Sequence, residues 1–313
     1  MPRIRRTLLA AATAVAVALS PMNVASAQPA QKEPALGTGV LLNITMDQTI
    51  GVTATFNPAD SRNVGIPALK RLRGEMWDLN PPFVDDWNGW NGTLRDAARS
   101  QGLTTKEAYV NAVYSDPAMV PIAVQRAVEE SARGSELNHD RPYNQSCLAH
   151  SPAASCKKST TATFNGEKMR GENLAWGSHS YALTEIIHQG WGHGEYQRLL
   201  ASNGRWASGN GHLWVLLSPA NYGFGFSHVT TQGGAYPVAA ATAISDRKQS
   251  RPDRSLDQRI TRTMYRPAAM HETPTGLERI TLREGTALPI QHTAELWGGT
   301  SHEWIAPRGQ PRH

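Results

Sequence analysis

Residues 222–228 alternate between aromatic side chains and very small ones, and this pattern restricts the fold more than any other feature of the chain. Glycine or serine separates the aromatic positions, in the order Tyr222, Gly223, Phe224, Gly225, Phe226 and Ser227. Neighbouring side chains of a strand point to opposite faces, so the pattern predicts a strand with one aromatic face and one nearly bare face. Glycines on a strand face indicate that another element packs very close to it.

Four helices are predicted before this strand. Their spacing of apolar residues places them at 105–114, where Thr105 is a cap, at 116–134, from about residue 180 onward, and at 213–217. The end of the third helix stays open because each of its glycines weakens a helix by roughly 1 kcal/mol: Gly190, Gly192 and Gly194. Helices and strands mix without a regular strand-helix repeat, so we predict a layered α+β fold.

The first 27 residues have the composition of a secretory signal peptide. Three arginines precede an apolar run over residues 8–19, and Ala25-Ser26-Ala27 supplies small residues for cleavage. The run is too short to cross a bilayer of roughly 30 Å, which takes about 20 residues. We therefore expect a secreted, extracellular protein, free or associated with the cell surface, without a transmembrane segment.

The charge balance argues against nucleic acid as a partner. The chain has 31 Lys and Arg against 26 Asp and Glu, and loss of the signal peptide with its three arginines leaves a surplus of only two. Such a surplus is too small to attract nucleic acid or anionic lipid.

The chain contains two cysteines, Cys147 and Cys156. In an oxidising compartment this pair is most simply a disulfide that closes a short loop. Two free thiols are the alternative, whereas a zinc knuckle would need a gap of about two to four residues.

The mature chain is longer than a typical domain of ~100–150 residues, so we expect one main domain with appendages. Residues 28–104 are predicted to form an N-terminal extension that packs on a main domain at 105–232. Residues 233–268 are polar and basic and are predicted to be a linker. Residues 269–307 are predicted to form a small β extension, with strand-like runs at 277–282, 292–297 and 300–305.

Common catalytic signatures are absent from the sequence. It has no His-Glu-x-x-His, no Gly-x-Ser-x-Gly and no phosphate-loop motif. Glu185-x-x-His188 is half of a di-iron motif whose other half is missing. We expect His179, His188 and His193 to be solvated or partly packed. Nucleotide-binding and serine-hydrolase functions are therefore disfavoured.

Three motifs occur together in a specific order. They are His139-Asp-Arg-Pro after the second predicted helix, Gly-Glu-Asn-Leu-Ala-Trp-Gly at 171–177, and Gly211-His212 ahead of the glycine-aromatic strand. In this order, residues 105–232 resemble the CAP superfamily of cysteine-rich secretory proteins, antigen 5 and pathogenesis-related proteins, in its bacterial branch. The tail, through residues 285–289 and the run with Trp304, resembles a piece of a bacterial Ig-like domain.

The CAP resemblance implies an α-β-α sandwich with a central cleft lined by two histidines and two acids. Carried over by motif, His139, Glu172 and His212 take three of these places. The fourth falls on Glu195, although its distance from the preceding tryptophan is one residue longer than is usual in the family. Glu185 is the alternative for that acid.

The first cleft histidine also has an alternative, because His150 lies in a His-Ser near a cysteine, as in eukaryotic members. If His139 and His212 share the cleft, two imidazoles can ligate Zn²⁺ weakly while the carboxylates orient them or activate a water. The same side chains can instead stabilise the fold through hydrogen bonds among themselves.

The resemblance brings no single activity, because members are associated with sterol or lipid binding, with extracellular signalling or defence, and with proteolysis. We predict a non-enzymatic protein that binds a small apolar ligand or a cell-surface component. The alternative is a metal-assisted hydrolase of extracellular peptide or cell-wall material, with Glu172 as general base. In a third interpretation, the Ig-like tail does the binding and the CAP domain is only a spacer.

Overall fold

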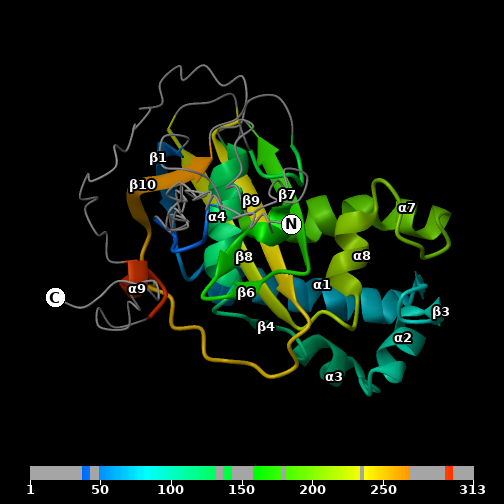
Figure 1. Cartoon of the computed structure of the whole chain (residues 1–313). Helices are drawn as coiled ribbons and strands as arrows, with labels where there is room; N and C mark the ends of the chain where they lie inside the picture. The colour runs from blue at the N-terminus through cyan, green and yellow to red at the C-terminus, as the bar shows by residue number, and fades with distance from the viewer. Residues whose placement is uncertain are drawn as a thin grey trace, which may run out of the picture. The chain divides into compact units, whose positions relative to one another are not determined.

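A six-stranded sheet is the central element of the computed structural model (Figure 1). The structure describes residues 37–42, 49–131, 137–142, 158–177, 181–232, 236–267 and 293–298. The strands are β1 (Thr49–Phe56), β4 (Tyr114–Ser115), β7 (Gly171–Gly177), β8 (Gly223–Thr231), β9 (Val238–Ser245) and β10 (Ile260–Pro267). Their order is β10-β1-β8-β9-β7, and β4 pairs with β8. Strand β7 is last in this order and is therefore an edge strand. Only the β4–β8 pair is parallel, so the sheet is largely antiparallel.

Helix α4 (Met119–Ser131) packs on the bare face of β8. A Cβ atom at Gly225 would collide with the backbone of Met119. Two residues further along, the Ser227 hydroxyl donates a hydrogen bond to the carbonyl of Ala123 (2.8 Å). The close approach predicted from the glycines is therefore confirmed, and the element that approaches is α4.

Three helices cover the aromatic face of β8: α1 (Ile66–Leu79), the π-helix η4 (Ile186–His193) and α8 (Gly211–Leu217). Phe224 and Phe226 are buried there, stacked with ring centroids 5.7 Å apart. Full burial of such a side chain stabilises the fold by about 1.5–3 kcal/mol. Helices thus lie on both faces of the sheet, and the predicted mixed α+β class is confirmed.

The helices predicted from apolar spacing are present. Helix α3 (Lys106–Asn111) begins after Thr105, whose hydroxyl accepts a hydrogen bond from the amide of Ala108 (3.1 Å). Helix α4 lies within its predicted range, and α8 ends at the predicted residue but begins two residues earlier, at Gly211. No helix among the described residues is long and apolar enough to cross a membrane.

The third predicted helix continues through its glycines as α6 (Leu183–Glu185), η4 and α7 (Gly194–Ala201). In the middle section the hydrogen bonds widen to the π pattern, in which the amide of Gly194 reaches the carbonyl of Gln189. At Gly192 a Cβ atom would lie 2.8 Å from the Leu72 side chain. The glycine therefore allows η4 to pack closely on α1.

The structure differs from the predicted domain division on both sides of residues 105–232. Residues 28–104, predicted to be an extension, supply β1, α1, α2 (Leu94–Ser100) and the hairpin of β2 (Pro82–Asp85) with β3 (Trp90–Thr93). Residues 233–268, predicted to be a linker, supply β9 and β10. Every residue of β9 is buried, so it has no polar alternation that would mark it as a strand.

The remaining short elements are η2 (Ser61–Gly65), η3 (Ser159–Thr161) and a hairpin of β5 (Thr163–Phe164) with β6 (Glu167–Lys168). In the predicted β extension at 269–307, the described residues 293–298 begin with a helical turn, α9 (Thr293–Leu296), so the strand predicted at 292–297 is wrong. Leu296 and Trp297 are buried there, and the Trp297 indole donates to the carbonyl of Thr38 (2.8 Å). Packing on the main sheet therefore decides the local structure. The rest of the extension and the predicted signal peptide lie outside the described residues.

Candidate functional site

His212 and Glu195 form the first of two histidine-carboxylate pairs. His212 lies in the first turn of α8 and Glu195 in the first turn of α7. One Glu195 oxygen lies 2.6 Å from His212 Nδ1, and the other accepts the amide of Leu213 (3.0 Å). The Glu195 carboxylate thus hydrogen-bonds both the imidazole and one backbone amide of the first turn of α8, where amides have no partner within the helix. Glu195, rather than the alternative Glu185, is therefore the partner of His212.

His139 and Glu172 form the second pair, with Nδ1 3.0 Å from Oε1. Glu172 lies on β7 and is almost wholly buried, whereas the His139 side chain is 64% exposed. Arg126 of α4 also donates to both Glu172 oxygens, from Nε (2.8 Å) and Nη2 (3.2 Å). Both oxygens of this carboxylate therefore already accept a hydrogen bond.

Buried arginines extend this second pair into a network. Arg126 also donates to Glu129 (2.5 Å) and Glu130 (3.2 Å), and Arg141 donates to Glu129 (2.6 Å). Arg126, Glu129 and Arg141 have fully buried side chains. Burial acts to raise the pKa of Glu129, but the charges of Arg141 and Arg126 lower it to about 2. Glu129 therefore stays ionised at neutral pH.

In the His139–Glu172 pair, too, burial and the neighbouring charges shift the pKa values in opposite directions. Burial acts to raise the pKa of Glu172, but the Arg126 charge and the hydrogen bonds from His139 and Arg126 lower it overall. The hydrogen bond to Glu172 raises the pKa of His139 above its ordinary value. A carboxylate with a depressed pKa and no free oxygen is a poor general base.

The two pairs lie on opposite faces of β7. Glu172 pairs across the sheet with Ala243 and points to α4, whereas the next residue, Asn173, donates to the carbonyl of His212 on the α8 side (3.3 Å). Among the described residues, no three of His139, Glu172, Glu195 and His212 bring their ligand atoms within 4.8 Å of one another. The four predicted cleft residues are present as two pairs, and no shared metal position is formed between them.

An apolar pocket of about 620 Å³ lies at the edge strand β7, and the His212–Glu195 pair lines it. The apolar part of its lining comes from β7, η4 and the segments next to them: Leu137, Leu174, Trp176, Tyr181, Ile186 and Trp191. The Trp191 and His212 rings lie 5.8 Å apart, and the Trp191 indole donates to the carbonyl of Leu174 (3.3 Å). The pocket thus has largely aromatic and aliphatic walls and one polar side.

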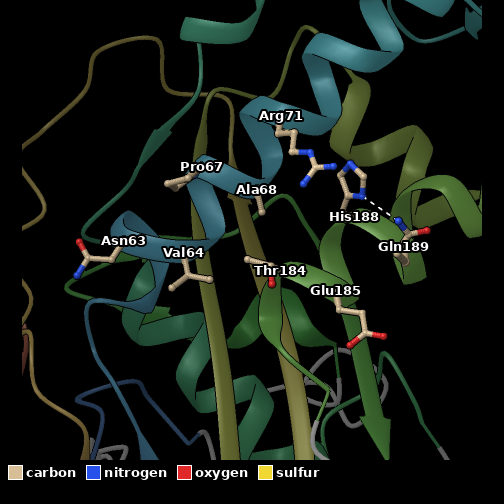
Figure 2. A pocket seen from close by; sticks show the side chains of 9 residues that line it. All are labelled: Asn63, Val64, Pro67, Ala68, Arg71, Thr184, Glu185, His188 and Gln189. Carbon is tan, nitrogen blue, oxygen red and sulfur yellow. Dashed lines mark hydrogen bonds between the residues drawn. The ribbon is translucent and has the colours of Figure 1, made fainter.

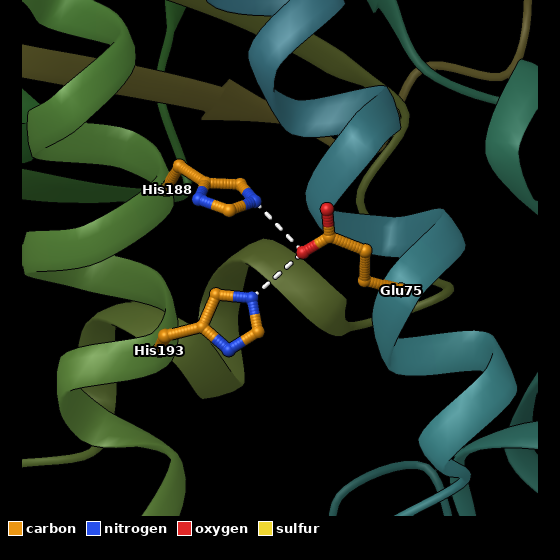
Figure 3. A group of neighbouring side chains, drawn as sticks. All are labelled: Glu75, His188 and His193. Carbon is orange, nitrogen blue, oxygen red and sulfur yellow. Dashed lines mark hydrogen bonds and ion pairs between the residues drawn. The ribbon is translucent and has the colours of Figure 1, made fainter.

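A third carboxylate, Glu75 of α1, was not identified from the sequence. His188 and His193 of η4 each place Nε2 2.7 Å from the same Glu75 oxygen (Figure 3). These three side chains are the group among the described residues whose geometry could hold a metal ion. Burial acts to raise the pKa of Glu75, but hydrogen bonds from His193, Arg71 and His188 lower it to about 2.

The available sequence signal for this group was the five-residue spacing of two histidines in a glycine-rich helix. An α-helix does not bring such a pair to one face, but a π-helix does.

The predicted disulfide of Cys147 with Cys156, and the alternative histidine His150, lie outside the described residues. Comparison of the chain with family models, with curated proteins and with solved structures finds no match. The site is therefore interpreted from its own geometry and motifs.

Proposed function

We propose that this protein is a secreted CAP-type protein that binds a small apolar ligand in the pocket beside β7. The pocket itself is the observation that carries the proposal. Its volume of about 620 Å³ is within the range of roughly 300–1,000 Å³ common for small-molecule sites. The Gly-Glu-Asn-Leu-Ala motif and the placement of helices on both faces of the sheet support the CAP part of the proposal.

The lining suits an apolar molecule with one polar end. Aromatic and aliphatic side chains make up most of the pocket wall. One of them, Tyr181, is also exposed to solvent. His212 Nδ1 is held by Glu195, while His212 Nε2 has no hydrogen-bond partner among the described residues. That nitrogen is the group we expect to bind the hydroxyl or carboxyl head of a ligand.

The two other predictions for this site find less support. Zinc shared by His139 and His212 has no supporting geometry, because the two residues are held by carboxylates on opposite faces of β7. A hydrolase that uses Glu172 as general base would need a free carboxylate oxygen, and Arg126 with His139 uses both.

Filling the pocket tests the proposal. Gly190 lines the pocket, and a Cβ atom added there meets nothing within 4 Å. We expect Gly190→Phe to fold normally, because replacing a helical glycine is neutral or stabilising, and to bind a fluorescent long-chain fatty acid analogue at least about tenfold more weakly, or 1.4 kcal/mol.

Gly190→Ala is the matched control and should bind the probe like the wild type. Equal probe affinity in Gly190→Phe and wild type, or no saturable binding to the wild type, would contradict the proposal.

A further inference from the structure

The group of Glu75, His188 and His193 lies outside the apolar pocket and connects α1 with η4. Figure 3 shows both imidazoles turned toward one carboxylate oxygen. The two rings lie 4.8 Å apart, and the three ligand atoms all lie within 4.8 Å of one another. Residues more than a hundred positions apart in the sequence thus converge on one point.

The π-helix is the reason for this convergence. Its hydrogen bonds span five residues, so His188 and His193 occupy successive turns on one face. A π-helix is rare, and such segments are frequent at functional sites. Gly192 allows η4 to pack against Leu72 of α1, one turn before Glu75. The backbone geometry and the helix contact therefore both serve to bring these ligands together.

The donor set has the chemistry of a transition-metal site. Two imidazole nitrogens and one carboxylate are the ligands of known catalytic zinc sites, with bonds of about 2.0–2.2 Å. A tetrahedral ion with such bonds holds neighbouring ligand atoms about 3.3 Å apart. Each histidine nitrogen now lies 2.7 Å from the Glu75 oxygen and would have to move outward by about 0.6 Å. The side chains of Glu75 and His193 are 35% and 33% exposed, which leaves them room to move.

The surrounding residues are compatible with a cation. Gln189 Nε2 lies 3.1 Å from His188 Nδ1. If its amide turns, the Gln189 carbonyl oxygen can accept a hydrogen bond from Nδ1–H when His188 Nε2 binds a metal. Arg71 donates to the other Glu75 oxygen (3.0 Å) and opposes a cation, but its side chain is 70% exposed and can move away.

An open hollow adjoins the group. His188 and Arg71 both line a pocket of about 490 Å³ between η2, α1 and η4 (Figure 2). Three protein ligands leave a fourth metal position, which water or a guest in this hollow could occupy.

We propose that Glu75, His188 and His193 bind one divalent transition-metal ion, and that zinc fits this donor set best. The proposal is independent of ligand binding in the apolar pocket.

Titration calorimetry of the untagged mature chain with Zn²⁺ tests it, with visible absorption of the Co²⁺ form as a second measurement of imidazole coordination. We expect one site in the wild type and at least about 100-fold weaker binding in His193→Ala and in Glu75→Gln. Glu75→Gln preserves the side-chain shape, so circular dichroism should show that this variant is folded.

Two further variants make the result specific. His139→Ala, which removes an exposed histidine on the other face of the sheet, should bind zinc like the wild type. Arg71→Ala should bind it more tightly, because a neighbouring positive charge is lost. Absence of zinc binding, or affinity retained in both His193→Ala and Glu75→Gln, would overturn the proposal.

Discussion

The two sides of the sheet use histidine and glutamate in different ways. On the α4 side, Glu172 is 2% exposed, and Arg126 and His139 occupy both of its oxygens. On the α1 side, Glu75 is 35% exposed and is bound by two histidines and one exposed arginine. Both oxygens of each carboxylate are hydrogen-bonded, so burial is the difference between the two groups. The buried Arg126 is fixed on Glu172, whereas the exposed Arg71 can leave Glu75, and for this reason we propose a ligand site only at Glu75. Residue type alone therefore does not distinguish the two roles.

Removal of the buried arginine should have the largest effect. Arg126→Leu leaves Glu129, Glu130 and Glu172 buried without their shared cation, and breaking such a pair costs about 3–5 kcal/mol of unfolding free energy. Urea unfolding measures this loss. Arg71→Leu is the control from the other side, with an expected change below about 0.5 kcal/mol because that ion pair is exposed. A loss under about 1 kcal/mol in Arg126→Leu would show that the network does not hold the fold.

Zinc should stabilise the chain through the α1 side only. At a free zinc concentration of 100 times its Kd, binding adds about 2.7 kcal/mol to the stability, which thermal unfolding detects as a rise in Tm. His139→Ala should show the full rise, and Glu75→Gln, which we expect to bind at least about 100-fold more weakly, at most about 0.4 kcal/mol. A rise of the same size in Glu75→Gln would place the metal elsewhere.

The smallest effect is the pH dependence of the His139–Glu172 pair. Because the folded-state pKa of His139 is raised, the stabilisation is complete below the unfolded value of about 6.5 and is lost as pH rises through the folded value. The side chain is largely exposed, so we expect at most about 1 kcal/mol between wild type and His139→Gln at pH 6. The difference should disappear near pH 9. NMR titration of His139 should give a pKa above 6.5, and a value below it would contradict the assignment.

Local patterns in the sequence predicted the elements whose signals are contained within one segment. The spacing around Val120 and Val124 predicted α4, and the alternation at 222–228 predicted both β8 and the close contact at Gly225. The fully buried strand β9 has no such alternation, and the pairing of β1 with β10 joins the strands of the main sheet that come first and last along the chain. These features depend on contacts between distant segments, which a local pattern does not encode.

The sequence predicted four residues of the two histidine-carboxylate pairs, but neither the separation of the pairs nor the part of Glu75. Motifs identified His139, Glu172 and His212, while the separation of the pairs follows from the alternation of Glu172 and Asn173 on β7. Glu75 lies 113 residues before His188 and carries no motif of its own. The five-residue spacing of the histidines places them on one face only because this segment forms the π-helix η4.

The central claim is that ligands bind on the edge and α1 side of the sheet, whereas the His139–Glu172 network only stabilises the fold. Fatty acid probe affinity and urea stability, measured together for His139→Ala and Gly190→Phe, test it most directly. The account predicts wild-type probe affinity with slightly lower stability at pH 6 for His139→Ala, and lost affinity with unchanged or higher stability for Gly190→Phe. Loss of probe binding in His139→Ala together with retained binding in Gly190→Phe would contradict it.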